Sequence, residues 1–263
     1  MELPDIQKIK DTRGICIDKA GICNLQVPVS ISMKNSENLC HTVATVQATV
    51  NVHSEVKGIN MSRLPIFIQN NRNLTLSLIQ EYAYQICDIC ETDNCELIYK
   101  FPYFLTKKAP VSLIEGIVQY DSYFRINKIN DEITRSIGIT AIASTCCPCS
   151  KEISDYNAHN QKCYISIDCN VIQEDILWLE DLINYAESSA SWPSYSVLKR
   201  PDEKFVTEKM YEHPQFVEDV VRDCYASLIH CDKILDFKVT AIADESIHMH
   251  KAYASIATPG WNC

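Results

Sequence analysis

The chain has 263 residues, of which 46% are hydrophobic, so it can bury a sizeable core as one large domain or two modules. Its formal net charge of −10 argues against a general nucleic-acid binder or a membrane-surface protein. No apolar run approaches the roughly 18 residues of a transmembrane helix, and residues 1–10 lack the apolar core of a secretory signal, so we expect a cytoplasmic protein.

The N-terminal part of the chain changes from an irregular pattern to a β pattern. Residues 1–25 are predicted to form an irregular arm, because Gly14 and Gly21 interrupt it. Apolar and polar residues then alternate with a period of two over 27–33 and again over 46–52. These two runs predict a long antiparallel hairpin.

The rest of the chain predicts two similar successions of strands and helices. A helix is expected from Leu74, with apolar residues at helical spacing through Ile86. The remaining elements are expected as strands at 96–106, 116–127, 136–146, 162–171, 235–244 and 252–257, and as helices at 174–187 and 214–231. This order indicates an α+β fold of two tandem β-β-α-β-β modules with mainly antiparallel sheets, over residues 26–130 and 131–263. Exposed sheet edges favour oligomerisation.

A run of cysteines precedes a histidine where a strand is predicted to end. Cys147-Pro148-Cys149 is followed by His159 within a polar segment that gives thiols little reason to serve packing. Pro148 disfavours a helix, and two cysteines one residue apart point the same way on an extended backbone. Thiolates and imidazoles bind zinc and similar ions, and a low-pKa cysteine can do chemistry. The first interpretation is a metal-assisted enzyme; the alternative is a buried structural thiol pair.

Two further clusters offer polar groups for the same chemistry. His248 and His250 lie between two predicted strands and are a possible ligand source, or else part of a solvated turn. Glu203 can complete a Cys/His/His ligand set, and Glu218 can accept the donor pair of a guanine-like base. Both carboxylates are otherwise explained as ordinary charges near helix starts.

A basic turn offers an anion site. Lys57 and Gly58 precede Ser62 and Arg63 near a helix start, and Lys108 can add positive charge for a polyphosphate. The run lacks a P-loop pattern, and the alternative is a plain turn with Ser62 as a local cap.

The fourteen cysteines of the chain are mostly interpreted as reduced core residues. Cys87 and Cys90, with Cys95 nearby, form a second possible metal or redox cluster. The alternative is that these three residues end a helix and lead into a strand.

Several motifs together resemble prokaryotic GTP cyclohydrolase type IB. From about His41 to Ala257, and in order, these are Lys-Gly-x-x-Met-Ser-Arg, Lys-Lys-Ala-Pro-Val-Ser, Cys-Pro-Cys-Ser-Lys-Glu-Ile-Ser, Ala-His-Asn-Gln, Lys-Arg-Pro-Asp-Glu, Phe-Val-Glu-Asp and Glu-Ser-Ile-His. The resemblance implies a tunnelling fold (T-fold) and a homotetramer with active sites at subunit interfaces. It also implies conversion of GTP and water to 7,8-dihydroneopterin triphosphate and formate, the first step of tetrahydrofolate and often of deazaguanine synthesis.

The resemblance also implies roles for individual residues. One divalent metal per site, Zn, Mn or Fe, would be bound by Cys147, His159, Glu203 and His248. Cys149 would be an acid/base or positioning group, and Glu218 would anchor the guanine edge. The candidates for triphosphate contacts are Lys57, Ser62, Arg63 and Lys108.

The chain departs from the usual family pattern at Asn60, Cys146, Asn157 and Met249, and none of these removes a predicted ligand. Three other functions are compatible with parts of the pattern. A related nitrile reductase with the same fold uses a nucleophilic cysteine and NADPH but no metal. A cyclohydrolase variant yields a cyclic phosphate, and a binding protein would hold the nucleotide without releasing formate.

Overall fold

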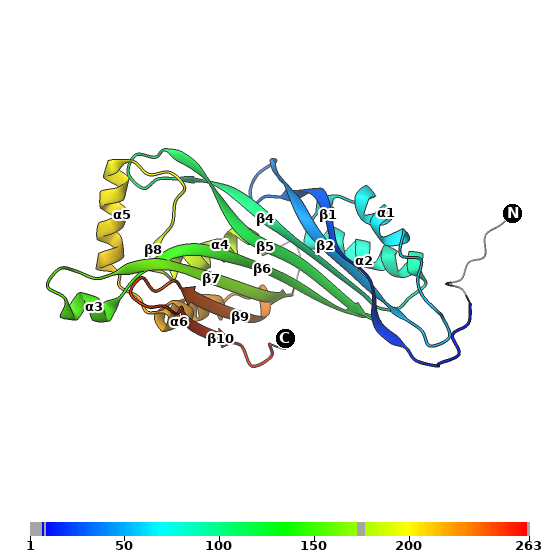
Figure 1. The fold of residues 1–263 in the computed structure, drawn as a ribbon. Coiled ribbons are helices and arrows are strands. Elements are labelled where there is room, and N and C mark those ends of the chain that lie inside the picture. The colour runs from blue at the N-terminus through cyan, green and yellow to red at the C-terminus, as the bar shows by residue number, and fades with distance from the viewer. Residues whose placement is uncertain (1–6, 8, 173–176, 262–263) are drawn as a thin grey trace. The chain divides into compact units, whose positions relative to one another are not determined.

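The computed structural model describes residue 7, residues 9–172 and residues 177–261 (Figure 1). Its chain divides into two compact units. Unit 1 comprises residues up to Phe101 together with Tyr123–Ser136; unit 2 comprises Pro102–Ser122 and the residues from Ile137 onward. The sequence prediction placed a division at residue 130. The units divide the chain differently because three long strands, β4 (Cys95–Lys108), β5 (Glu115–Ile129) and β6 (Glu132–Cys146), contribute residues to both.

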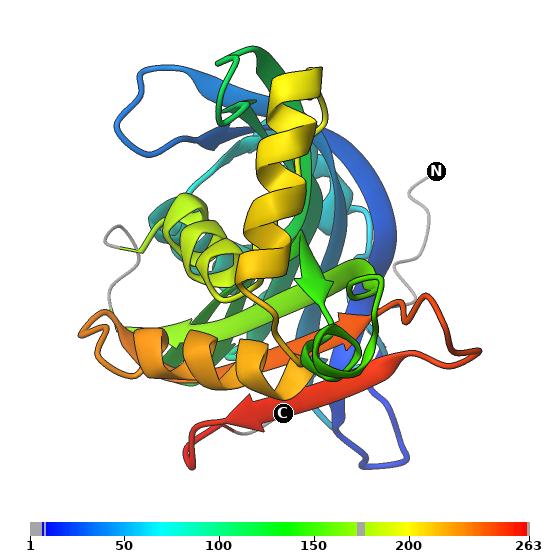
Figure 2. The same cartoon turned by 90° about the vertical axis from the view of Figure 1, so that its left-hand side faces the viewer.

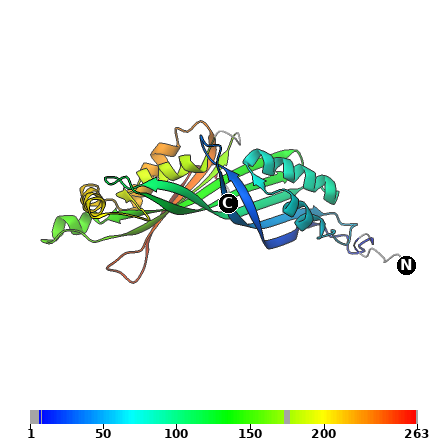
Figure 3. The same cartoon turned by 90° about the horizontal axis from the view of Figure 1, so that it is seen from above.

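Unit 1 is built on an antiparallel hairpin of β1 (Ile17–Ser32) and β2 (Leu39–Val52). The period-two pattern buries Val27, Val29 and Ile31 on one strand, which confirms the predicted hairpin. β2 pairs with β4, and the short β3 (Asn73–Leu74) adds to β1 in parallel. Helices α1 (Arg63–Asn70) and α2 (Leu76–Cys90) lie on one face of these strands (Figure 3).

The first strand begins earlier than predicted, so the irregular arm does not extend to residue 25. Gly21 is not a chain breaker: it pairs with Thr49, and a Cβ atom on it would overlap the carbonyl of Ala48. The pairing is irregular on both sides of this position, as expected where a glycine lets two strands approach closely.

The helix pair of unit 1 differs partly from the prediction. α2 begins at Leu76 rather than Leu74, where the Thr75 hydroxyl accepts a hydrogen bond from the Leu78 N–H at 3.1 Å. α1 was not predicted, because only Leu64 and Ile68 are buried in its eight residues and give too short an apolar period.

The strands of unit 2 follow the order β10-β9-β7-β6, continued by the parts of β5 and β4 that belong to this unit. Here β7 is Asn160–Val171, β9 is Ile234–Ala243 and β10 is Ala252–Ala257. The two-residue β8 (Trp192–Pro193) pairs with β6. Helix α6 (Val217–Leu228) packs against β9 and β10, and α4 (Leu179–Ser188) packs against β7 and α6. Figure 2 shows α5 (Arg200–Glu212, yellow) and α6 (orange) as separate helices joined by a short segment.

The helices of unit 2 correct the prediction at three places. α6 spans twelve residues instead of 214–231, and Pro214 precedes it. The helix predicted at 174–187 begins at Leu179; residues 174–176 of that prediction lie outside the described residues. α5 was not predicted, because its surface is mostly charged and it buries only Asp202 and Val206.

Pro148 starts a helix rather than excluding one. It occupies the first turn of α3 (Pro148–Ile153), where a missing N–H costs no hydrogen bond and the fixed φ suits the helix. Cys147 is the extended residue before the helix and Cys149 is helical, so the two thiols are not on one extended strand.

The pairings β1–β2, β2–β4, β6–β8, β7–β9 and β9–β10 are antiparallel and the short pairing β1–β3 is parallel, which confirms the predicted α+β, mainly antiparallel architecture. No helix in the described part of the chain is long and apolar enough to cross a membrane.

Candidate active site

A pocket of about 530 Å³ in unit 2 gathers half of the predicted site residues. We call it the thiol–imidazole pocket. Its walls come from α3, the start of β7, the start of α6 and the β9–β10 loop. The predicted residues that line it are Cys147, Cys149, His159, Glu218, His248 and also His250.

Hydrogen bonds around Ser150 hold Cys147 next to His159. The Cys147 N–H donates to the His159 carbonyl at 3.1 Å, so the two backbones are paired directly. The Ser150 hydroxyl donates to the Cys147 carbonyl at 3.2 Å and accepts the His159 N–H at 3.2 Å. The Cys147 sulfur itself accepts the Ser150 N–H at 3.5 Å, as the cap of α3.

Neighbouring Cys146 is buried, and burial raises the pKa of its thiol. It therefore stays protonated and packs in the core, while the half-exposed Cys147 is the thiol available to a ligand.

The imidazole of His159 is held by polar groups from β7 and from the β9–β10 loop. Its Nδ1 lies 2.9 Å from Gln161 Oε1, 3.3 Å from Ser246 Oγ and 4.0 Å from a Glu245 carboxylate oxygen. The sequence motif contained Gln161, but no role could be assigned to it without the fold. Ser246 and Glu245 lie in the β9–β10 loop, and only the fold brings them to His159.

The histidines of the β9–β10 loop are exposed. The rings of His248 and His250 stack with centroids 5.0 Å apart, and the His248 N–H donates to the Glu245 carbonyl at 3.3 Å. Glu218 is also exposed and lies in the first turn of α6, beside Asp219, whose carboxylate caps the helix by accepting the Phe216 N–H at 3.1 Å. The helix dipole favours an acidic side chain in this first turn. The exposed Glu218 carboxylate is therefore well placed to accept hydrogen bonds from a ligand.

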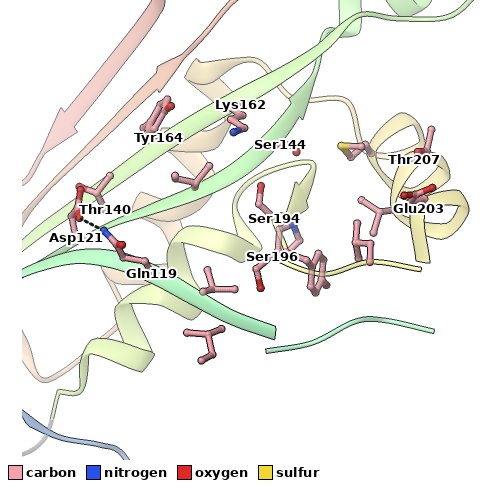
Figure 4. Close-up of a pocket in the computed structure, with 18 residues that line it drawn as sticks. Gln119, Asp121, Thr140, Ser144, Lys162, Tyr164, Ser194, Ser196, Glu203 and Thr207 are labelled. Atoms are coloured by element: carbon pink, nitrogen blue, oxygen red, sulfur yellow. Dashed lines mark hydrogen bonds between the residues drawn. The ribbon is translucent and has the colours of Figure 1, made fainter. Parts of the chain in front are cut away.

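Glu203 lies in α5 and lines a different pocket of unit 2, of about 670 Å³. Figure 4 shows it on the helix with Thr207, across from Ser194 and Ser196. The structure thus brings Cys147, His159 and His248 to one pocket and Glu203 to another.

The residue before Glu203 is a buried anchor that the sequence analysis missed. The Asp202 carboxylate accepts the backbone N–H groups of Val111, Ser112 and Lys199 at 2.8–2.9 Å and the Ser112 hydroxyl at 2.6 Å. Burial alone would raise its pKa, but the hydrogen bonds from Ser112 and the backbone hold the pKa well below its usual range. Asp202 therefore ties the start of α5 to the β4–β5 loop.

The predicted triphosphate residues are distributed over both units. Lys57, Ser62 and Arg63 lie in unit 1, and Lys108 lies in unit 2, 3.7 Å from Glu115. The Arg63 guanidinium donates to the Ile89 carbonyl at the end of α2. Ser62 is the N-cap residue of α1, but its side chain makes no capping hydrogen bond there.

The second cysteine cluster joins a helix end to a strand start, as its alternative interpretation predicted. Cys87 and Cys90 close α2, and Cys95 opens β4. A hydrogen bond from the Cys95 side chain lowers the pKa of Cys87 to about 7, while the same interaction raises the pKa of Cys95 well above its usual value.

The thiol–imidazole pocket offers the donor types that a zinc-like ion prefers. A thiol and two imidazoles suit Zn, Mn or Fe by chemistry. Within residues 7, 9–172 and 177–261, however, no three His, Cys, Asp or Glu side chains are placed closely enough to hold an ion. The donor set fits a divalent metal, but its ligand geometry is not assembled.

Comparisons with known proteins identify the family. A family model described as type I GTP cyclohydrolase folE2 matches residues 3–254. This chain belongs to the type I GTP cyclohydrolase FolE2 family. A GTP cyclohydrolase FolE2 of Thermosipho africanus is 41% identical over 253 residues, covering 96% of each chain. One from Nitrosococcus oceani is 37% identical over 255 residues, covering 97% of this chain and 94% of the relative.

A solved structure of urate oxidase from Bacillus sp. TB-90 has the same fold as this FolE2 family member. It matches with a TM-score of 0.53 over 92% of this chain and 99% of its own, at 10% sequence identity. The predicted tunnelling fold is confirmed; at this identity the likeness concerns the fold alone.

Proposed function

We propose that this chain is a metal-dependent GTP cyclohydrolase, which converts GTP and water to 7,8-dihydroneopterin triphosphate and formate. The observation that carries the proposal is the gathering of Cys147, His159, Glu218 and His248 around one pocket from four separate elements. Membership of the FolE2 family supports this activity over the nitrile reductase and the cyclic-phosphate variant. The product would enter tetrahydrofolate synthesis.

We assign one divalent cation, Zn, Mn or Fe, to Cys147, His159 and His248, with Glu203 as the fourth ligand. Glu203 lines another pocket, so its inclusion requires α5 to bring it towards the other three. When bound by these residues, the cation would supply Lewis-acid chemistry for hydrolysis at C8 of guanine.

The remaining residues of the pocket would bind the base and move protons. The exposed Glu218 carboxylate accepts the N1–H and the exocyclic amine of guanine, which match its two oxygens. Cys149 directly follows Pro148 in α3 and is exposed. It can therefore exchange a proton with the five-membered ring of guanine as that ring opens.

The contacts to the triphosphate and the assembly are part of the proposal. Lys57, Ser62, Arg63 and Lys108 are the candidates for the phosphates, and Arg63 must give up its bond to the Ile89 carbonyl to serve there. We propose a homotetramer in the cytoplasm. Exposed apolar side chains at the pocket, such as Ile153 and Tyr253, favour cover by another subunit.

The deciding experiment is to incubate reduced protein, loaded with Zn, Mn or Fe, with GTP. Formate and the fluorescence of the oxidised pterin are measured with and without EDTA. Metal-dependent formate with a neopterin triphosphate product supports the proposal. No formate with any of the three metals overturns it, and a cyclic-phosphate product would replace it by the variant.

Two variants separate metal binding from base binding. Cys147→Ala should lower bound metal and turnover together, because it removes a ligand; full metal occupancy would remove Cys147 from the ligand set. Glu218→Ala should keep bound metal and reduce turnover at least 100-fold, since a buried base would lose its paired acceptor. Normal turnover in that variant would contradict the anchoring role.

A further inference from the structure

The side chains of Thr145, Gln161 and Glu245 form a hydrogen-bond network that ends on His159. We propose that Glu245, acting through Gln161, fixes the tautomer of His159 so that its Nε2 is free to bind a cation. The proposal rests on the assignment of His159 as a ligand in the proposed function. Gln161 and Glu245 are positioning residues in this account, because they act through the imidazole.

The first step is the orientation of the Gln161 amide. Its Nε2 lies 3.3 Å from Glu245 Oε1 and 3.1 Å from Thr145 Oγ1. A carboxylate only accepts hydrogen bonds, so the NH₂ group of the amide must face Glu245. The amide oxygen is then directed to the other side, towards His159.

The second step is the position of the imidazole proton. Gln161 Oε1 lies 2.9 Å from His159 Nδ1, and an amide oxygen can only accept. His159 must therefore carry its proton on Nδ1, and the lone pair of a neutral ring is left on Nε2. The Ser246 hydroxyl, 3.3 Å from Nδ1, can accept as well and does not oppose this tautomer. The negative charge of Glu245, 4.0 Å from Nδ1, favours it.

The third step is rigidity. Thr145 is buried in β6, Gln161 and His159 lie at the start of β7, and Glu245 follows the end of β9. Only 14% of the His159 side chain and 16% of the Glu245 side chain are exposed. The Glu245 carbonyl also accepts the His248 N–H, so the same residue supports the loop of a second predicted ligand. Groups held on strands in this way fix a ligand's orientation, and losing such a partner lowers metal affinity by about 10–100-fold.

The test combines metal affinity with a direct observation of the tautomer. Binding of Zn²⁺ and Mn²⁺ alone is measured by competition with a chromophoric chelator, in wild type, Gln161→Leu and the exchange variant Gln161→Glu/Glu245→Gln. The exchange keeps the total charge and places a carboxylate acceptor opposite Nδ1. Gln47→Leu is the matched control, a half-buried strand glutamine in unit 1. Tautomers are assigned in metal-free, ¹⁵N-histidine-labelled protein by long-range proton–nitrogen NMR.

We expect Nδ1–H in the wild type and in the exchange variant, and a mixture of tautomers in Gln161→Leu. Metal affinity should fall about 10–100-fold in Gln161→Leu and stay near the wild-type value in the exchange variant and in Gln47→Leu. An Nε2–H tautomer in the metal-free wild type, or unchanged affinity in folded Gln161→Leu, would overturn the proposal. A protein that releases no formate but shows these tautomer and affinity changes would refute the cyclohydrolase and leave this inference standing.

Discussion

Replacing Glu187 by alanine should destabilise unit 2 by about 3–5 kcal/mol, because it breaks a buried ion pair from one side. Glu187 is only 8% exposed, and its carboxylate is 2.6 Å from Lys107 Nζ and accepts the Tyr120 hydroxyl at 2.9 Å. The Lys107 side chain is only 18% exposed, and this burial lowers its pKa. Without Glu187, the partners left to the ammonium among the described residues are the Ser194 carbonyl, at 3.2 Å, and the ring of Tyr195.

The size of the effect depends on the charge left behind rather than on the pair itself. An unpaired buried charge accounts for most of the cost, and the orphaned Tyr120 hydroxyl adds about 1–3 kcal/mol if water does not reach it. The double variant Lys107→Met/Glu187→Gln removes both charges and keeps an acceptor for Tyr120. It should therefore lie within about 2 kcal/mol of wild type, although it carries one more substitution.

The assay is urea unfolding followed by tryptophan fluorescence at one fixed protein concentration, because an oligomer's stability depends on concentration. The three tryptophans, Trp178, Trp192 and Trp261, all lie in unit 2, so the signal reports on that unit. Glu208→Ala is the control: its ion pair with Lys204, at 2.9 Å, is exposed and should contribute at most about 1 kcal/mol. A cost below about 1 kcal/mol for Glu187→Ala, or a double variant as unstable as the sum of its single variants, would refute the reasoning.

Two other substitutions test local electrostatics. Cys95→Ala should raise the pKa of Cys87 from about 7 towards the ordinary thiol value near 8.5, because it removes the hydrogen bond that favours the thiolate. The pH dependence of Cys87 alkylation, read by mass spectrometry against Cys224 in the same digest, measures this, and an unchanged midpoint would contradict it. Asp202→Asn should loosen the β4–β5 loop, since an amide cannot accept all four hydrogen bonds. Amide exchange at Ser112 should become faster; equal protection in variant and wild type would show that Asp202 does not anchor the loop.

Local periodicity was sufficient to predict those helices and strands that have one face in the core and the opposite face towards solvent. The alternation in β1 and β2 and the apolar stripe of α2 correspond directly to buried positions such as Val29, Val50 and Ile79. A strand that places alternate residues in the core must alternate in sequence, so the tertiary structure adds no information there. The order of elements and the short motifs then predicted the fold class and the family.

Elements whose stability comes from a distant partner could not be predicted in this way. Glycine usually interrupts a predicted strand, yet Gly21 lies within β1. The β2 backbone at Ala48 approaches this position so closely that a residue with a side chain would not fit. The charged helix α5 has almost no apolar stripe, and the buried Asp202 carboxylate holds its start to a loop about ninety residues earlier in the chain. These contacts connect residues far apart in sequence, so no window of sequence contains both partners.

The properties of the candidate site can also be separated into those that the sequence determines and those that need the tertiary structure. The sequence alone determined the chemical types: the thiols, the imidazoles and the carboxylates, with Cys147 close enough to His159 in the chain to be seen as a pair. Only the tertiary structure decided which of these groups share a pocket, that Glu203 lines another, and that Gln161 and Glu245 lie beside His159. The reason is physical: a side chain's chemistry is carried by its own residue, whereas its orientation is set by hydrogen bonds from strands that meet only when the sheet forms.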